Sequence, residues 1–234
     1  MNVKVLGSGS KGNCYIIQEG KEKLILELGL SFNKIKQGLG YDLRGVKGAL
    51  VSHSHSDHSK GVLKALENSI DIYMHDETIN ELELNKGHRL HAIKPKKQFK
   101  IGCFNIMPLE ANHDVKCLSF LISTGKDKLL FVTDSYYFKY RVPGVNKILI
   151  ECNYDDNIIE YLLPYEARLL KSHMSLKTCK KTLGRFDLEK CKSIMLIHIS
   201  DRHGNKEKFK EEIYNLTGIK TYIAEPGAEM EDKN

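Results

Sequence analysis

Four residues that can bind metal ions lie close together in the segment Ser52–Ser59, namely His53, His55, Asp57 and His58. His53 and His55 are two positions apart, so an extended backbone points both side chains the same way. Asp57 and His58 are adjacent, so a turn can direct them elsewhere. Imidazole and carboxylate groups are suitable ligands for zinc, iron or manganese. This spacing predicts one loop that serves two metal centres, in preference to a chance cluster of surface histidines.

Candidate partners for this loop are found far along the chain. Apolar runs of strand length precede four candidate ligand positions, His53, His113, Asp134 and His198. Strands that end at one rim would bring these positions together, because open α/β folds place ligands at the carboxyl ends of their strands. Alone, His113 or His198 is equally well explained as a buried histidine with a hydrogen-bond partner. Together with the loop, both indicate a metal site.

Short apolar runs along the chain predict the elements that must position these residues. We expect strands at 3–6, 14–17, 24–26, 49–51, 70–74, 104–107, 118–122, 129–132, 148–150, 194–197 and 221–224. Two helical faces are expected, one made by Val62, Leu63, Ala65 and Leu66, and one made by Phe209, Ile213 and Leu216. This mixture predicts an α/β fold of layered sheets covered by helices.

The composition is that of a globular protein. The hydrophobic content of 41% predicts a globular fold, and the length of 234 residues predicts a single domain over residues 1–234. No apolar run approaches the ~20 residues that span a membrane. Six scattered cysteines, without a signal peptide, indicate reduced thiols in the cytoplasm. The net charge of +6 favours an anionic partner only mildly, since solubility is the better explanation. The polar tail after Gly227 is expected to fray.

The segment Gly7–Gly12 fits the pattern G-x-G-x-x-G. A dinucleotide site would need a helix to begin at these glycines, so that the N-terminus of the helix faces the pyrophosphate. The next residues, Cys14–Ile17, indicate a strand instead. We therefore expect a tight turn between two strands.

With these residues, the chain resembles the metallo-β-lactamase-fold hydrolases. Those proteins share an H-x-H-x-D-H loop followed by a later His, a later Asp and a final His. Four segments resemble the YycJ/WalJ branch in particular, at Gly7–Asn13, Glu151–Asp155, Ser172–Ser175 and His198–Ser200. That branch is DNA 5′-exonuclease-like and similar in outline to the tRNA 3′-processing endonucleases. The resemblance implies a four-layer αββα sandwich, with two mixed sheets flanked by helices.

The resemblance also implies how the site residues divide between two metal ions. The first ion would be bound by His53, His55 and His113. The second would be bound by Asp57, His58 and His198, with Asp134 bridging the two. The family usually has an Asp-x-Gly turn where this chain has Glu27-Leu28-Gly29. We expect Glu27 to organise the metal-binding loop, with its longer side chain shifting the groups around the ligands.

A site with two divalent cations and two ligand carboxylates keeps a positive charge and attracts an anion, which suits a phosphodiester. A lactam or thioester would also suit the fold. In the phosphodiester-cleaving branches, a His in a motif similar to Lys171–Ser175 contacts the scissile phosphate or protonates the leaving oxygen. We therefore predict His173 and Asp57 as catalytic residues. The alternative for His173 is a helix cap or an exposed side chain.

The predicted function is a hydrolase with two divalent metal ions, zinc first and manganese or iron as alternatives, that cleaves nucleic-acid phosphodiester bonds. Two other functions remain open: a phosphodiesterase for small nucleotides or cyclic phosphates, and a non-catalytic metal-binding regulatory module. The intact ligand set disfavours the module, and the width of the cleft would distinguish polymers from small esters. Lys94, Lys96 and Lys97 could bind a phosphate backbone or form a solvated loop. No membrane partner is expected, and the oligomeric state stays open.

Overall fold

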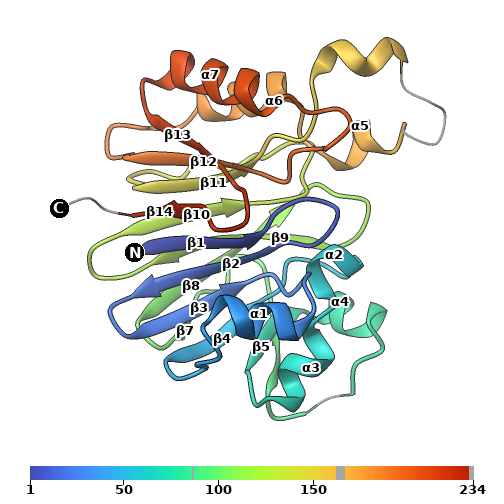
Figure 1. Ribbon diagram of the computed structural model, residues 1–234, viewed down its shortest axis with the longest axis vertical. Coiled ribbons are helices and arrows are strands. Elements are labelled where there is room, and N and C mark those ends of the chain that lie inside the picture. The colour runs from blue at the N-terminus through green and yellow to red at the C-terminus, as the bar shows by residue number, and fades with distance from the viewer. Residues whose placement is uncertain (86, 162–166, 232–234) are drawn as a thin grey trace.

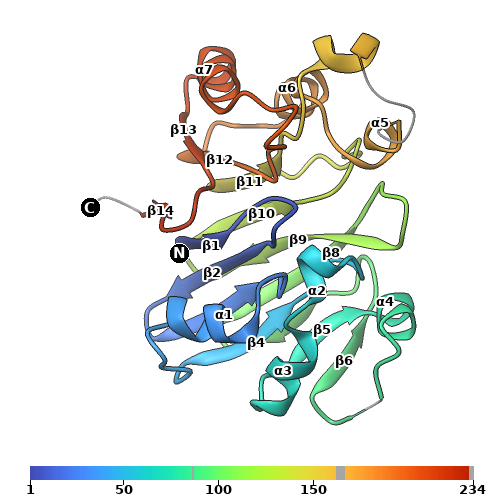
Figure 2. The same cartoon turned by 45° about the vertical axis from the view of Figure 1, so that its right-hand side comes forward.

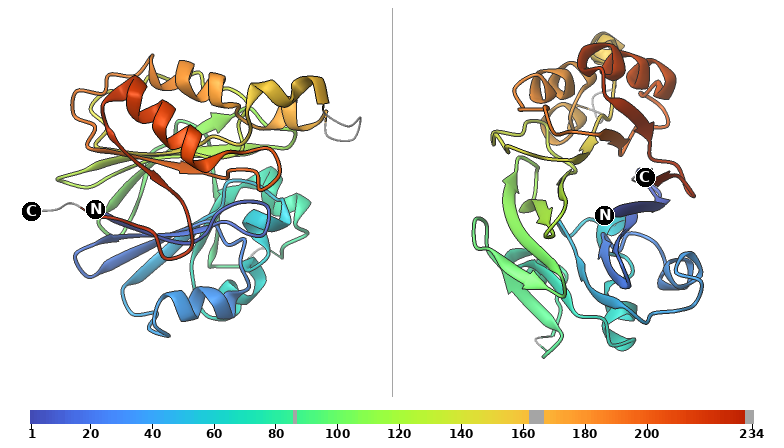
Figure 3. Two further views of the ribbon diagram at one scale, coloured as in Figure 1. Left: turned by 45° about the horizontal axis from the view of Figure 1, so that its top comes forward. Right: turned by 90° about the vertical axis from the view of Figure 1, so that its left-hand side faces the viewer.

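The protein consists of two seven-stranded sheets that stack face to face, with helices on both outer surfaces (Figures 1 and 3). The computed structural model describes residues 1–85, 87–161 and 167–231. The first sheet has the strand order β14 (Glu229–Met230), β1 (Asn2–Gly7), β2 (Cys14–Glu19), β3 (Glu22–Leu26), β4 (Val46–Leu50), β5 (Ile72–His75) and β6 (Leu90–Ile93). The second has the order β13 (Lys220–Ile223), β12 (Ser193–Ile197), β11 (Lys147–Glu151), β10 (Lys128–Val132), β9 (Cys117–Ser123), β8 (Phe104–Ala111) and β7 (Phe99–Ile101).

The helices lie on the outer surfaces and around one end of the sheets. Those of the first half are α1 (Phe32–Gly38), α2 (Ser56–Ser59), α3 (Val62–Glu67) and α4 (Asp76–Glu81). Those of the second half are the 3₁₀ helix η1 (Asp156–Tyr161), α5 (Leu169–Ser172), α6 (Leu176–Leu183) and α7 (Lys206–Thr217). The predicted four-layer αββα sandwich is confirmed. Within the described ranges, no helix has the length and apolarity that crossing a membrane requires.

The two sheets repeat one pattern of strand directions. In the first sheet, β14 to β3 pair antiparallel and β3 to β6 pair parallel. In the second sheet, β7 to β10 pair antiparallel and β10 to β13 pair parallel. The two halves of the chain are therefore built alike, and each supplies a set of parallel strands whose carboxyl ends can carry functional side chains.

Successive side chains of a strand point to opposite faces of its sheet and fill the spaces between the layers. Phe131 of β10 faces the core between the two sheets, where it packs with Phe120 and Tyr15. Its neighbours Leu130 and Val132 face the helices outside the second sheet. A third core lies between the first sheet and helices α1 and α3. Strands buried on both faces have no polar side, which explains the continuous apolar runs of β10, β11 and β12.

The sequence predicted most strands but not all of them. Strands β6, β7 and β14 were missed, because they are short and have no long apolar run. The prediction of a frayed tail after Gly227 was wrong for Glu229–Met230, since β14 pairs with β1 and buries Met230 completely, whereas residues 232–234 lie outside the described residues. The predicted helical faces were too wide. Leu63 is 61% exposed and Leu216 is 46% exposed, although the other apolar residues of both faces are at least partly buried.

The glycine-rich segment after β1 forms the expected turn, and β2 follows it. The backbone N–H of Asn13 donates to the Asp57 carbonyl at 2.7 Å, and the N–H of Gly29 donates to the Asn13 carbonyl at 2.9 Å. The turn, the segment after β3 and helix α2 are therefore in direct contact. A Cβ atom at Gly29 would lie 1.6 Å from the Asp57 carbonyl oxygen. Only glycine permits this approach.

We expect Gly29→Ala to destabilise the fold by about 1–3 kcal/mol, the usual cost of overpacking a well-packed interior. The clash is with backbone, so it cannot be relieved by a side-chain rotation. Gly125→Ala is the matched control, because a Cβ atom there meets nothing within 4 Å. Urea denaturation of both variants measures the effect. Equal midpoints for Gly29→Ala and the control would contradict this account of the turn.

Candidate metal centre

The loops that follow several strands meet at one end of the stacked sheets, between α2 and α5 (Figure 2). All seven residues predicted to bind metal come together here. They fall into overlapping groups whose potential ligand atoms lie within 4.8 Å of one another. The seven are His53, His55, Asp57, His58, His113, Asp134 and His198.

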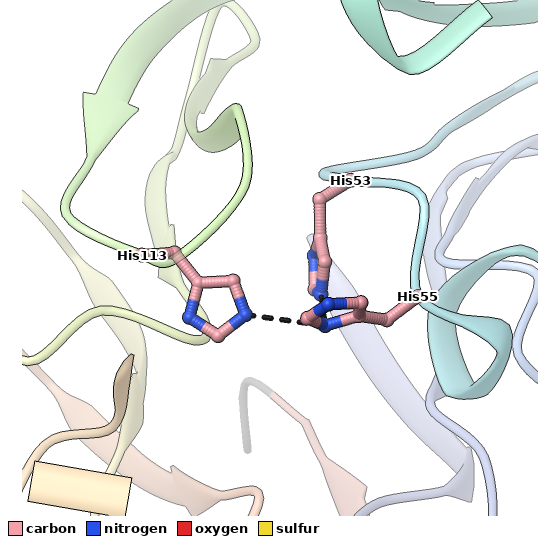
Figure 4. Close-up of side chains that lie close together, drawn as sticks. All are labelled: His53, His55 and His113. Atoms are coloured by element: carbon pink, nitrogen blue, oxygen red, sulfur yellow. Dashed lines mark hydrogen bonds between the residues drawn. The ribbon is translucent and has the colours of Figure 1, made fainter. Parts of the chain in front are cut away.

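Three histidines form the first group, and their ring nitrogens face one another (Figure 4). The Nδ1 atom of His55 lies 3.0 Å from His53 Nε2 and 3.2 Å from His113 Nε2. His113 Nδ1 lies 2.7 Å from the Ser172 carbonyl, so this nitrogen carries the proton and Nε2 keeps its lone pair. His53 Nδ1 lies 2.8 Å from Ser52 Oγ, which holds that ring on its other side. Nε2 of His53, Nδ1 of His55 and Nε2 of His113 therefore converge on one point.

The three histidines of this group are suited to bind a cation. Burial lowers the pKa of His53, His55 and His113, and repulsion between neighbouring imidazoles contributes to the lowering. Neutral imidazole is the form that binds metal. A cation placed among these ring nitrogens would be bound by the lone pairs of the neutral imidazoles.

The second group combines carboxylates with imidazoles. Asp57 Oδ2 lies 3.2 Å from His198 Nε2 and 3.4 Å from His58 Nε2. Asp134 Oδ1 also lies 3.4 Å from His58 Nε2. Burial, the largest single cause, lowers the pKa of both histidines, but Asp134 and the other nearby carboxylates together outweigh it and raise the pKa. The pKa of His198 rises to about 10. The carboxylates of this group therefore favour positive charge beside them, which a divalent cation can supply.

Asp134 lies between the two groups. Its Oδ2 atom is 3.9 Å from both His53 Nε2 and His113 Nε2, whereas its Oδ1 atom faces His58. The residue is 1% exposed, lies two positions after the end of β10 and has a φ of 38°. One carboxylate oxygen is thus directed toward each group.

Glu27 contacts the loop of the H-x-H-x-D-H motif, as expected. Its carboxylate accepts a hydrogen bond from the Ser52 backbone N–H, at 3.2 Å to Oε2, and the same oxygen lies 3.4 Å from His58 Nδ1. Asn13 supports the same ring from the other side, with its Nδ2 atom 3.0 Å from His58 Nε2. The longer Glu side chain therefore still reaches the loop.

Glu151 is a site residue that the sequence analysis did not assign. It is fully buried at the end of β11 and accepts hydrogen bonds from the backbone N–H groups of Ser135, at 2.9 Å, and Met174, at 3.0 Å. Its other oxygen lies 2.6 Å from His173 Nδ1 and 3.3 Å from His198 Nδ1. The sequence does contain one signal for this residue, a carboxylate at the end of an otherwise apolar strand.

His173 is held at the edge of the site. Its ring stacks on His198 with 5.2 Å between centroids, and its side chain is 17% exposed. Burial lowers its pKa, but the Glu151 carboxylate outweighs this and raises the pKa. Ser175, whose side chain accepts from the Thr178 N–H, caps the following helix α6. His173 is therefore neither fully exposed nor the N-cap of α6, although its backbone caps the C-terminal end of α5, where its N–H donates to the Leu169 carbonyl at 3.0 Å.

The site opens to the surface through a cleft of about 440 Å³. The cleft is lined by Ser10, His55, Ser56, Asp57, Asp134, Arg168, Leu169, Ser172, His173, His198 and His203. Arg168 is an exposed cation at its edge, with Nη2 3.2 Å from His55 Nε2 and Nε 2.5 Å from Asp114 Oδ2. A substrate anion in this cleft would meet His173, Arg168 and the histidine groups together.

Two mixed sheets between helices, with histidines and aspartates gathered where the strands end, define the metallo-β-lactamase fold. The chain belongs to the β-lactamase superfamily, since residues 29–199 match the family described as "Beta-lactamase superfamily domain". It is 28% identical over 223 residues to exodeoxyribonuclease WalJ of Streptococcus pneumoniae, covering 87% of this chain and 83% of that protein. It is 26% identical over 233 residues to exodeoxyribonuclease YycJ of Bacillus anthracis, covering 88% and 85%.

Solved structures show the same fold. The metallo-β-lactamase fold protein YhfI from Bacillus subtilis aligns with a TM-score of 0.79 and 19% identity, covering 99% of each chain. Zinc-bound PqqB from Methylobacterium extorquens aligns with a TM-score of 0.75 and 14% identity, covering 99% of this chain and 100% of the other. The chemistry of the donor groups and the family together indicate that the site binds divalent metal.

Two variants of Glu27 test its role in the site. Glu27→Gln keeps an oxygen that can accept from the Ser52 N–H but removes the charge beside His58. Glu27→Ala removes both. We expect the Gln variant to fold normally and to bind metal about 10–100-fold more weakly, the usual effect of losing a group that supports a ligand. We expect the Ala variant also to lose stability, by about 1–3 kcal/mol, because a buried N–H loses its partner.

Titration with zinc against a competing chelator measures the affinity, and urea denaturation of the metal-free protein measures the stability. Wild-type metal affinity in both variants would show that Glu27 does not organise the loop.

Proposed function

We propose that this protein is a hydrolase with two metal ions that cleaves phosphodiester bonds of nucleic acid. The observation that carries the proposal is the position of His173, a histidine held by Glu151 beside two groups of metal-binding side chains and open to the cleft. The names of the relatives support the choice of substrate, because WalJ and YycJ are exodeoxyribonucleases.

The ligand assignment follows the two groups. His53, His55 and His113 would bind the first ion. Asp57, His58 and His198 would bind the second, and Asp134 would bridge both. Zinc is the first choice, with manganese and iron as alternatives, because imidazole and carboxylate suit all three. When bound, such ions lower the pKa of water and polarise the phosphate.

The side chains of this chain supply the remaining steps. Glu151 accepts at Nδ1 of His173, so the ring can present a proton at Nε2 toward the cleft. A sugar alkoxide is a poor leaving group, and that proton would stabilise it as the P–O bond breaks. The exposed guanidinium of Arg168 at the cleft edge would bind a phosphate oxygen and orient the substrate. Asp57 lies in the same cleft and holds His198 in place.

A phosphodiesterase for small nucleotides is the second candidate. The cleft is open and lined by exposed residues such as Arg168, which suits a polymer that extends beyond the site. The complete donor set disfavours a regulatory module without catalysis.

We place the protein in the cytoplasm, because all six cysteines are free thiols and five of them are buried, which suits a reducing compartment.

The metal assignment predicts two ions per chain after gentle purification. His53→Ala should weaken one centre, whereas Asp134→Ala should weaken both, because its two oxygens face different groups. Elemental analysis of the purified proteins, followed by zinc titration, measures both effects. An Asp134→Ala variant that keeps one ion at wild-type affinity would show that Asp134 serves a single centre. A wild-type protein that takes up neither zinc nor manganese would exclude the metal assignment.

A pair of substrates tests the role of His173. His173→Ala should keep the metal content and lower the hydrolysis of a normal phosphodiester by ~10²–10⁴-fold, the usual contribution of a general acid. Hydrolysis of a nitrophenyl phosphodiester should fall much less, since its leaving group needs little protonation. Steady-state kinetics with both substrates make the comparison. Equal losses would mean that His173 binds the phosphate or positions the loop instead.

A further inference from the structure

The segment that joins β10 to β11 contains Asp134 and, just after it, a run of aromatic and basic residues. Its sequence over Tyr136–Arg141 is Tyr-Tyr-Phe-Lys-Tyr-Arg. Tyr136 is 45% exposed and Tyr137 is 38% exposed, which is unusual for large aromatic side chains. Aromatic residues interleaved with cations on a surface are typical of single-strand nucleic-acid binding.

Hydrogen bonds fix the two exposed tyrosines to the loops of the metal centre. The Tyr136 N–H donates to the Asn112 carbonyl at 3.1 Å, and the Asn112 side chain donates to the Tyr137 carbonyl at 2.8 Å. Ser135 Oγ donates to the same Tyr137 carbonyl at 2.8 Å and accepts from the Asn112 N–H at 2.9 Å. Asn112 precedes His113 and Ser135 follows Asp134. The two rings are therefore carried on a rigid support beside the site.

The next aromatic residue anchors the segment in the protein interior. Phe138 is 1% exposed and packs edge-on against Phe186, with 6.1 Å between ring centroids. With one ring buried and its neighbours exposed, the segment is held to the body of the second sheet while Tyr136 and Tyr137 face outward. A surface held in this way loses little conformational freedom when it binds a ligand.

Cations lie beside these rings. The Arg185 guanidinium lies 5.4 Å from the Tyr137 ring centroid and donates to its hydroxyl. Lys96 and Lys139 lie 5.9 Å and 5.4 Å from the centroid of Tyr140. Lys96 comes from the lysine-rich loop before β7, so the structure brings that loop to the aromatic segment. Together, the tyrosine rings can contact the bases of a nucleic-acid strand and the cations can contact its phosphates.

The carboxylate of Glu110, near this surface, is paired with lysines. Glu110 accepts from Lys139 at 3.1 Å and from Lys116 at 3.5 Å, so two lysines accompany one acid. Arg141 is exposed and adds a further positive charge at the end of the segment. We call the residues Lys96, Tyr136, Tyr137, Lys139, Tyr140, Arg141 and Arg185 the aromatic–basic rim.

We infer that the aromatic–basic rim binds a single-stranded segment of the nucleic-acid substrate, an inference that rests on the proposed function. Unpaired bases would stack on Tyr136 and Tyr137, and the cations would bind the phosphates next to them. Bases inside a duplex have no free face to offer. The substrate would therefore be a strand, or a strand end, that is unpaired as it leaves the metal centre.

Binding of short oligonucleotides that carry the fluorescent base 2-aminopurine and uncleavable phosphorothioate linkages tests the inference. Stacking on tyrosine quenches this fluorescence, so we expect quenching with single-stranded DNA or RNA and weaker binding of the same sequence as a duplex. Replacing both tyrosines by Ala should weaken single-strand binding about 5–150-fold, which corresponds to ~1–3 kcal/mol for a stacked base. Replacing both by Phe should retain the binding and the quenching.

Tyr214→Ala is the matched control, because that tyrosine is 54% exposed on α7 and outside the rim. Turnover of bis(p-nitrophenyl) phosphate, which is too small to reach the rim, should stay within about twofold of wild type in every tyrosine variant. Binding by the double Ala variant that equals wild type, or equal affinity for duplex and single strand, would overturn the inference. Quenching and binding without any hydrolysis of nucleic acid would uphold the rim and exclude the nuclease.

Discussion

The structure depends on carboxylates that are buried where the strands end. Glu27, Asp134 and Glu151 are each at most 1% exposed. Burying a charged group is costly unless hydrogen bonds and opposite charge compensate it. Glu27 and Glu151 accept from backbone N–H groups, whereas Asp134 accepts from the Thr133 hydroxyl and otherwise faces imidazoles. The histidines and the loop that carries the H-x-H-x-D-H motif supply the hydrogen-bond donors and the positive charge that these buried groups need.

The repeated strand pattern explains how one site receives acids from both halves of the chain. Glu27 follows β3 and Asp134 follows β10, which hold equivalent places in their sheets. In the first half, Glu27 accepts from the backbone N–H of Ser52, after the neighbouring strand β4. In the second half, the direction is reversed, since Glu151 of β11 accepts from the N–H of Ser135 beside Asp134. One acid is thereby used to hold a loop, and the equivalent acid is left free to face both metal-binding groups.

The sequence predicted which histidines and aspartates come together, because these residues in the H-x-H-x-D-H spacing have few structural uses. The four layers were predicted from the resemblance that this motif carries, and the apolar runs supported them. Glu151 was not assigned, because a lone carboxylate after an apolar run has no distinctive spacing and acts through residues distant in the sequence. The pairing of Met230 with the first strand, and the exposure of Tyr136 and Tyr137, were also missed. Each depends on which segments meet in three dimensions, which local patterns do not contain.

Three residues at this end of the sheets have left-handed backbone, with φ values of 66° for Glu27, 38° for Asp134 and 51° for His198. Residues with a Cβ atom adopt this conformation at a cost of order 1–3 kcal/mol each when the backbone is strained. Glycine would relieve that cost at all three positions and would remove the side chain that the site needs. Selection for thermal stability alone would therefore favour changes that erase the chemistry. These three site residues keep the folding stability of the protein lower than it could be. Searches for stabilised variants should therefore leave the three positions unchanged.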